Sequence, residues 1–183
     1  DLTEEAITSK EQGIKLYMNS LSKLIYASTS MNSISSRGHV IFTFKYVKNL
    51  NGKKIASKLN IVDLAGSERT SKSGVSGERM KEASYVNISL LSLLGVVKTL
   101  TNPNMKSNTY VPYRDSKLTS LLRDSLGGNS KTNLIINVSP SELNEPETLS
   151  SLRFGNRAKQ IKNKPKVNKE YTIAELLLLL EKA

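Results

Sequence analysis

The chain has 183 residues, 38% of them hydrophobic, and this apolar fraction favours a folded core over a disordered tail. It contains no cysteine, which excludes disulfides and cysteine-ligated zinc and fits the cytosol. Lys and Arg number 27 against 16 Asp and Glu, and the net charge of +11 predicts a polyanionic partner: nucleic acid, an anionic membrane surface or an acidic protein polymer.

The first expected element is a helix over residues 9–24. Ser9 and Gln12 have the spacing of a capping box, and apolar residues follow at roughly helical spacing. The acidic residues 1–5 before it lack an apolar stretch, so they do not form a signal peptide. Residues 28–38 are a serine-rich polar loop, which taken alone is more often a solvated connector than a functional site.

Strands and a long helix follow in the middle of the chain. Residues 40–47 and 58–62 are expected strands, and Asn51-Gly52 between them is a hairpin signal. Residues 70–80 form an expected flexible loop. A helix over 81–101 is expected to bury one stripe of apolar side chains, namely Val86, Leu90, Leu93, Leu94, Val97 and Leu100.

The last third of the domain contains a short helix over 115–126 that Gly127-Gly128 ends. The apolar run at 134–138 is typical of a buried central strand, and 146–161 is the last domain helix. Mixed strands and helices, with one strand that ends in Asp-x-x-Gly at residues 63–66, indicate an α/β fold.

The Asp63-Leu64-Ala65-Gly66 segment carries the first chemical signal. An Asp at the end of a buried strand can reach a phosphate-bound Mg²⁺ through water, and a Gly three residues later can offer its N–H to a γ-phosphate. Asp-x-x-Gly is common, however, and by itself it is more often an ordinary strand-end turn.

Five motifs read together resemble the kinesin motor domain, over about residues 25 to 170. Asn32-x-x-Ser35-Ser36-Arg37-x-His39 is similar to kinesin switch I, and Asp63-Leu64-Ala65-Gly66-Ser67-Glu68 is similar to switch II. The other three matching motifs are residues 111–119, 126–130 and 154–159.

The resemblance implies a kinesin-type P-loop NTPase fold, with a mostly parallel sheet flanked by helices, that uses ATP and Mg²⁺. It implies that Ser36 and, through water, Asp63 bind Mg²⁺, because hard cations take oxygen ligands. It also implies that Ser35 and Gly66 lie beside the γ-phosphate. Asn32 would tie the loop to the nucleotide side.

Three further assignments follow from the same resemblance. Arg37 would pair with Glu68 when the switches close and so help to order the attacking water; the alternative is an ordinary surface pair of little energetic value. Asn87 matches the Asn of the family's N-K-S-L segment at the start of the relay helix. His39 is interpreted as a core histidine with no catalytic role, and a single histidine argues against a histidine metal site.

A kinesin ATPase also needs a G-x-x-x-x-G-K-S/T loop to hold the phosphates, and these 183 residues contain none. Residues 127–132 end in Lys-Thr but lack a Gly before the Lys. Since the resemblance places that loop before switch I, we expect this chain to be the C-terminal half of a motor domain, inactive alone and without the N-terminal strands. Gly38 and Ile88 replace a Ser and a Lys of the family pattern, which puts full catalytic efficiency in question.

The expected polyanionic partner is the microtubule, so the resemblance implies a cytoplasmic protein on the cytoskeleton. Two alternatives stay open: a kinesin-like module that grips microtubules without hydrolysis, and a nucleic-acid-binding domain. The second is disfavoured because the chain is only 5% aromatic. A solvated face remains the alternative for any single cation among the candidate contacts, which are Arg69, Lys72, Arg79, Lys81, Arg114, Lys117 and Arg123.

The C-terminal segment resembles a kinesin neck linker over residues 162–168, in which Val167 would be a docking side chain and Asn168 a hydrogen-bonding latch. The expected division is a motor-domain half at 1–161, a linker at 162–170 and the start of a neck helix at 171–183. That helix would form a homodimeric coiled coil, although Leu176–Leu180 is one heptad at most. This longest apolar run is also far below the about 20 residues of a membrane span.

Overall fold

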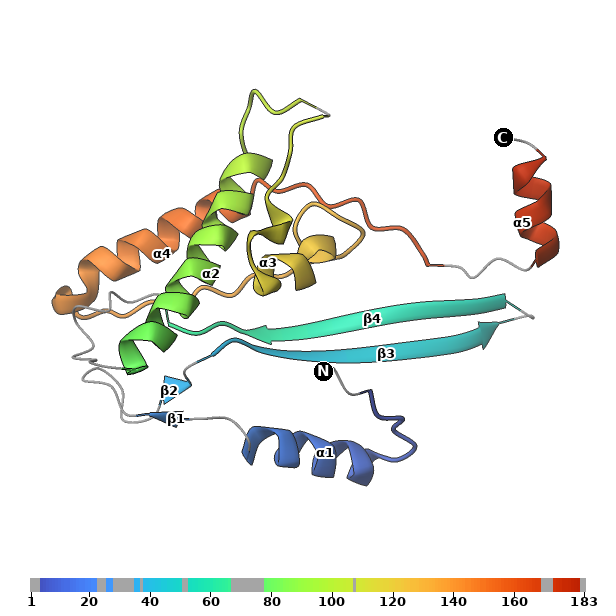
Figure 1. Cartoon of the computed structure of the whole chain (residues 1–183), viewed down its shortest axis with the longest axis horizontal. Helices are drawn as coiled ribbons and strands as arrows, with labels where there is room; N and C mark the ends of the chain where they lie inside the picture. The colour runs from blue at the N-terminus through green and yellow to red at the C-terminus, as the bar shows by residue number, and fades with distance from the viewer. Residues whose placement is uncertain are drawn as a thin grey trace.

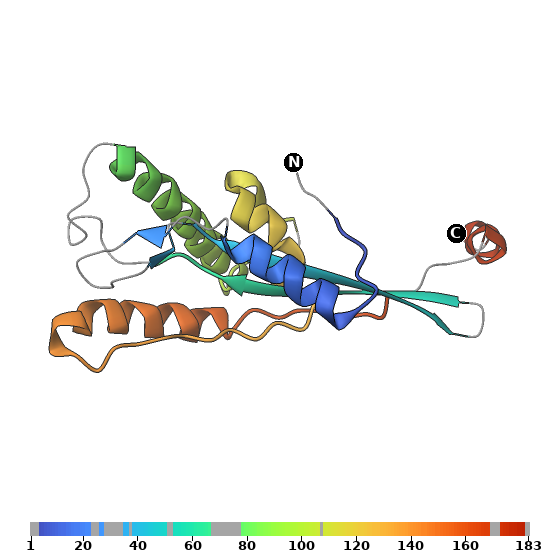
Figure 2. The ribbon, with the colours of Figure 1, turned by 90° about the horizontal axis from the view of Figure 1, so that it is seen from below.

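The computed structural model describes residues 4–22, 26–27, 35–36, 38–50, 53–66, 78–106, 108–168 and 173–181. Figure 1 shows a long two-stranded hairpin with helices on both sides, and Figure 2 shows the same layers from below. No helix in these ranges is long and apolar enough to cross a bilayer.

The hairpin consists of β3 (Val40–Leu50) and β4 (Lys53–Asp63), which pair antiparallel from Val40 opposite Asp63 to Leu50 opposite Lys53. Both predicted strands are present, and both are longer than predicted. The register leaves only Asn51 and Gly52, which lie outside the described residues, between the paired ends. Backbone pairing thus continues to the last described residue of each strand, beyond the apolar pattern from which the strands were predicted.

Helix α1 (Lys10–Ser22) confirms the first predicted helix and packs on the hairpin, where the Tyr17 and Phe42 rings lie 5.0 Å apart. Ser9 Oγ accepts from Gln12 N at 3.1 Å, as the capping pattern predicted. The Gln12 side chain does not complete the reciprocal bond to Ser9, because Gln12 Oε1 accepts from Thr8 N at 2.9 Å.

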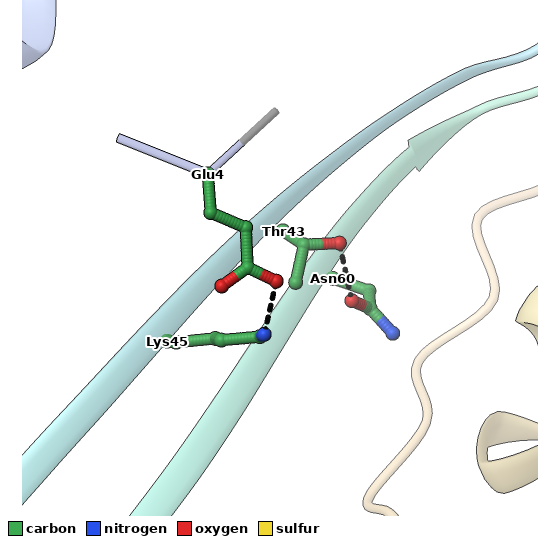
Figure 3. A network of polar contacts seen from close by, with 4 residues as sticks. All are labelled: Glu4, Thr43, Lys45 and Asn60. Carbon is green, nitrogen blue, oxygen red and sulfur yellow. Dashed lines mark hydrogen bonds and ion pairs between the residues drawn. The ribbon is translucent and has the colours of Figure 1, made fainter. Parts of the chain in front are cut away.

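The hairpin also carries polar contacts, which Figure 3 shows from close by. The Lys45 ammonium donates to the Glu4 carboxylate, and Thr43 Oγ1 donates to Asn60 Oδ1 at 2.9 Å across the strand pair. The Lys45 and Glu4 side chains are 57% and 61% exposed, so solvent screening leaves this ion pair little energetic weight.

Helix α2 (Glu78–Leu100) lies across the hairpin and forms the core. Leu93 packs with Leu118 and Leu122 in a buried cluster, and the hairpin contributes Ile41 and Val62 to its edge. The predicted stripe on α2 is mostly correct, since Leu93 and Val97 are buried. The prediction for Leu94 was wrong, because this side chain is 39% exposed. Val96, which was not predicted, is buried instead.

The predicted helix over 115–126 is wrong as a single element. The structure has a 3₁₀ turn at Tyr113–Asp115, helix α3 at Lys117–Leu121 and a second 3₁₀ turn at Arg123–Ser125. Ser116 and Thr119 form a full capping box that starts a new helix inside the predicted one. The fully buried Thr119 hydroxyl also bonds the Tyr113 carbonyl at 2.8 Å, which fixes the preceding turn.

The predicted central strand at 134–138 is also wrong as a strand. These residues have no strand assignment, and Ile135 is 83% exposed. Only Ile136 packs closely, against Gly155 of helix α4 (Glu145–Ala158), where an added Cβ would lie 2.9 Å from Ile136 Cγ1. A buried parallel strand needs neighbours on both edges, and the described residues supply none.

The strand pairing of the described residues therefore differs from the mostly parallel sheet that the resemblance implies. Both described sheets are antiparallel pairs: β3 with β4, and the short β1 (Tyr26–Ala27) with β2 (Ser35–Ser36). Helices still flank the longer sheet, in line with the predicted α/β arrangement.

After α4, the chain returns without regular structure over 161–168 and reaches helix α5 (Ile173–Leu180), which confirms the last predicted helix. Both views place α5 at the end of the molecule where β3 ends and β4 begins (Figures 1 and 2). Its described leucines are exposed, Leu180 at 73%.

Candidate functional site

Two residues of predicted switch II are exposed where β4 ends. Asp63 is the last residue of the strand and lies opposite Val40, the first residue of β3. Asp63 and Gly66 are exposed, whereas Ala65 between them is buried. The carboxylate and the Gly66 backbone are therefore open to a ligand while the intervening residue anchors the segment in the protein.

The predicted switch I residues reach the same end of the hairpin. Ser35 and Ser36 form β2, paired with Ala27 and Tyr26 respectively. Figures 1 and 2 agree that the β1–β2 pair lies where β3 begins and β4 ends, beside the N-terminal part of α2. The structure thus brings the backbone of Ser35–Ser36 near Asp63, two segments that the sequence separates.

Several predicted site residues lie outside the description. Asn32, Arg37 and Glu68 are outside the described residues, and of Ser35 and Ser36 only the backbone is described. The pairing of Arg37 with Glu68 therefore stays a prediction. Asn87 is described: it is half-buried on α2.

The donor chemistry at this end of the hairpin fits Mg²⁺ bound with a nucleotide. Asp63 offers an exposed carboxylate, and Ser36 carries a hydroxyl, so both are oxygen donors. Among the described residues no three His, Asp or Glu side chains gather as a metal cluster. Mg²⁺ usually keeps waters and phosphate oxygens alongside one or two protein ligands, so the two oxygen donors named above match its needs.

His39 joins three segments behind this site. Its Nδ1 accepts from Ala65 N at 3.1 Å, and its Nε2 lies 2.6 Å from Ser89 Oγ on α2. The Ser89 hydroxyl in turn donates to the Val86 carbonyl at 2.6 Å. Burial lowers the pKa of His39 below its ordinary value of 6.5. The sequence interpretation assigned this residue only a place in the core, and its position as the last residue of the switch I motif was the available signal.

Three of the predicted microtubule contacts have side chains that the structure describes. Lys117 is exposed at the start of α3, and Arg114 and Arg123 are exposed on the 3₁₀ turns on either side of it. The Arg123 guanidinium lies 5.7 Å from the Tyr113 ring centroid, in cation–π range. Burial raises the pKa of the Tyr113 phenol, and the positive charge of Arg123 opposes that rise. Arg69 and Lys72 lie outside the described residues, as do the side chains of Arg79 and Lys81 at the start of α2.

The linker segment is held by the loop at residues 125–132, and we call the two together the linker clamp. The half-buried Asn163 provides its centre. Asn163 Oδ1 accepts from Gly127 N at 2.7 Å. Its Nδ2 lies within 3.0 Å of the Ser125 carbonyl and 2.9 Å of both the Ser130 carbonyl and Thr132 Oγ1.

A second asparagine grips the linker from the loop side. The Asn129 Oδ1 accepts from Lys166 N, and its Nδ2 donates to Asn168 Oδ1 at 2.7 Å. The Asn168 carbonyl accepts from Ala56 N of β4 at 3.3 Å. Asn168 is thus hydrogen-bonded at the place predicted for a latch. Val167 is 68% exposed, so its part in docking stays a prediction.

Pro165 fits the linker clamp because its nitrogen faces away from the loop at residues 125–132. Lys164 N donates to the Gly128 carbonyl at 3.0 Å, and Lys166 N donates to Asn129. Neighbouring N–H groups of an extended chain point in opposite directions, so the nitrogen of residue 165 faces away from the loop. Proline lacks an N–H and therefore loses no bond to the loop at this position.

The two loop glycines are required by the backbone. Gly127 has a φ of +87°, in the left-handed region. A Cβ on Gly128 would lie 2.7 Å from Asp124 Cα and 2.8 Å from its carbonyl oxygen. The pair predicted only as a helix stop thus also shapes the surface that binds the linker.

Comparison with known proteins decides the family. The family model of the kinesin motor domain matches residues 1–161. The chain belongs to the kinesin motor domain family. It is 50% identical over 184 residues to kinesin-related protein 3 of Dictyostelium discoideum and 48% identical over 183 residues to the kinesin heavy chain of Syncephalastrum racemosum. Each match covers 99% of this chain but only 15% and 19% of the two relatives.

Two solved structures share its fold. A KIF14 dimer in the two-heads-bound state with AMP-PNP, in complex with a microtubule, matches with a TM-score of 0.85 and 39% identity. KIF14 with ADP, also in complex with a microtubule, matches with a TM-score of 0.73 and 38% identity. The matches cover 98% and 93% of this chain and 51% and 50% of those chains. The kinesin-type P-loop NTPase fold predicted from the motifs is confirmed.

Proposed function

We propose that this kinesin chain carries the switches, the microtubule-binding face and the neck linker of a microtubule-stimulated ATPase motor. The observation that carries the proposal is the continuity of β4. Its last residue, Asp63, lies at the expected nucleotide site, and Ala56 of the same strand bonds Asn168 of the linker. Seven residues of strand span about 23 Å, so one paired element connects the proposed chemical and mechanical ends.

At the chemical end, Ser36 and, through water, Asp63 would hold Mg²⁺, which neutralises charge on the phosphates when bound. Gly66 would donate its N–H to the γ-phosphate, and Ser35 would lie beside it. Asn32 and Asn87 would support the nucleotide side. The Arg37–Glu68 pair would close over the site and order the water that attacks the phosphate.

The partner in this proposal is the microtubule. Support comes from the net charge of +11, the exposed Arg114 and Lys117, and the two matched structures, both described as complexes with a microtubule. We also propose a cytoplasmic location on microtubules, with residues 1–161 as the motor-domain part. The exposed leucines of α5 support dimerisation through a neck helix that begins near residue 171.

A non-hydrolysing microtubule-binding module is the second candidate, because these 183 residues contain no phosphate loop. The deciding experiment uses a complete motor domain, in which this chain is joined to a kinesin half with the phosphate loop. We expect ATP turnover that microtubules accelerate, and a loss of about a hundredfold in Glu68→Ala, which leaves Arg37 unpaired.

The charge swap Arg37→Glu with Glu68→Arg should restore part of that turnover. A motor domain that binds microtubules but hydrolyses no ATP would favour the module. Near-normal turnover in Glu68→Ala would refute the role of the pair, and the chain without the phosphate-loop half should bind ATP weakly in calorimetry.

A further inference from the structure

One polar cluster behind the switches has no role in the function proposed above. It consists of His39, Ala65, Ser89 and Val86, and we call it the His39 cluster. These residues come from three separate segments: His39 precedes β3, Ala65 follows β4, and Ser89 and Val86 belong to α2. The two contacts of His39 join residues 26 and 50 positions away in the chain.

The donors and acceptors of the cluster can be arranged in only one way for neutral His39. The Ala65 N–H can only donate, so His39 Nδ1 must lack a proton and accept. The ring proton then lies on Nε2 and is donated to Ser89 Oγ. The Ser89 hydroxyl proton remains free to be donated to the Val86 carbonyl, the acceptor found within 2.6 Å. Each polar hydrogen thus has one acceptor. The three hydrogen bonds form a chain in which Ala65 donates to His39, His39 to Ser89 and Ser89 to Val86.

The cluster lies between the proposed γ-phosphate contact and helix α2. Ala65 is the residue before Gly66, whose N–H is proposed to meet the γ-phosphate, and Ser89 lies two residues after Asn87 on the relay helix. A partly buried imidazole needs hydrogen-bond partners, and His39 finds them on two separate segments rather than on its own. Here the ring connects the buried residue of switch II to α2 with one bond on each side.

We propose that His39 and Ser89 are positioning residues that couple switch II to α2. The proposal rests on the proposed motor function. In it, a displacement of Gly66 on loss of the γ-phosphate moves Ala65, and the His39 ring transmits that displacement to Ser89 and the helix. Without the ring-to-serine bond, switch II would keep only its apolar contact with α2, through Leu64 and the cluster around Leu93, and would transmit a displacement to the helix more weakly.

The geometry can be tested on the 183-residue chain itself, because His39 is its only histidine. Nitrogen-15 NMR of the imidazole reports which ring nitrogen carries the proton. We expect the Nε2–H form at neutral pH, with a hydrogen-bonded Nε2–H signal that weakens in Ser89→Ala. An Nδ1–H form, or an Nε2–H signal that Ser89→Ala leaves unchanged, would overturn the proposal.

The coupling is tested by turnover in the complete motor domain. Ser89→Ala should lower microtubule-stimulated kcat about tenfold, the value of one hydrogen bond, while KM for ATP changes less than about twofold. Ser89→Thr keeps the hydroxyl and should recover most of the rate. Ser92→Ala is the matched control, since Ser92 Oγ donates within the same helix to the Ile88 carbonyl at 2.9 Å.

The outcomes separate this inference from the function on which it rests. A complete motor domain with no microtubule-stimulated turnover would overturn the proposed function and the coupling with it. Normal wild-type turnover with Ser89→Ala no different from Ser92→Ala would overturn only the coupling. A loss in Ser89→Ala that Ser89→Thr fails to recover would also overturn it, because the hydroxyl would then not be the cause.

Discussion

Removal of the Asn163 side chain tests the linker clamp most directly. In Asn163→Ala, the Gly127 N–H, two carbonyls and Thr132 Oγ1 all lose their contact with the linker. A net hydrogen bond contributes about 0.5–1.5 kcal/mol. Because the Asn163 amide shares its Nδ2 among three acceptors and the site is half-buried, we expect about 2–3 kcal/mol in total, or a shift of about 30- to 150-fold toward the undocked linker.

Linker docking can be followed by electron paramagnetic resonance of a nitroxide on Lys166→Cys, since the chain has no other cysteine and Lys166 is exposed. We expect an immobile signal in the otherwise unchanged chain and a mobile one in Asn163→Ala. The matched control is Asn133→Ala, an exposed asparagine next to the same loop, which should leave the signal immobile. An immobile signal in Asn163→Ala would refute the reasoning, because the clamp would then hold the linker without its central side chain.

Three further predictions use other parts of the structure. Gly128→Ala places a Cβ against backbone 2.7 Å away and should destabilise the chain by about 1–3 kcal/mol in urea unfolding, whereas Gly95→Ala, with open space around it, should stabilise the helix. Arg114→Ala with Lys117→Ala should weaken microtubule co-pelleting about tenfold at low salt. The deficit should shrink as salt screens the contribution that these two cations make in the unchanged protein, and an equal deficit at all salt concentrations would contradict the prediction. Because burial lowers the pKa of His39 below 6.5, the unfolded state binds a proton at higher pH than the folded state, so the free energy of unfolding should fall as pH drops below about 6.5. His39→Gln should lose less stability over the same pH range. If urea unfolding at several pH values gives the same dependence on pH for both proteins, His39 is not the cause.

Local signals in the sequence predicted the elements whose cause is local. The Asn51-Gly52 pair between two β-rich runs predicted the hairpin, and the apolar spacing of α2 predicted its buried side at Leu93 and Val97. The capping signal inside 115–126 is also local. Ser116 and Thr119 mark a helix start at Lys117, which is where the predicted single element divides.

The features that the sequence did not predict depend on contacts between residues far apart in the chain. The apolar run at 134–138 predicts burial, but a strand forms only where neighbouring strands accept its backbone bonds. Among the described residues it has no such neighbour, and only Ile136 packs, against Gly155 of α4. The contacts of His39 were equally inaccessible, because they join residues 26 and 50 positions away. For the same reason the motif predicted that Asn168 forms hydrogen bonds but not that Asn129 would be its partner.

The two kinds of connection in this chain suit different tasks. The hairpin is paired along eleven residues of each strand, so β4 connects Asp63 to Ala56 through a continuous ladder of backbone hydrogen bonds. The linker, in contrast, is held by amide groups whose bonds weaken steeply once their distance or angle changes. A paired strand that contacts the linker near its start and ends at Asp63 can convert a small movement into the gain or loss of several geometry-sensitive bonds at once. We therefore expect the linker to respond to the nucleotide end in two states, docked and undocked, rather than by gradual loosening.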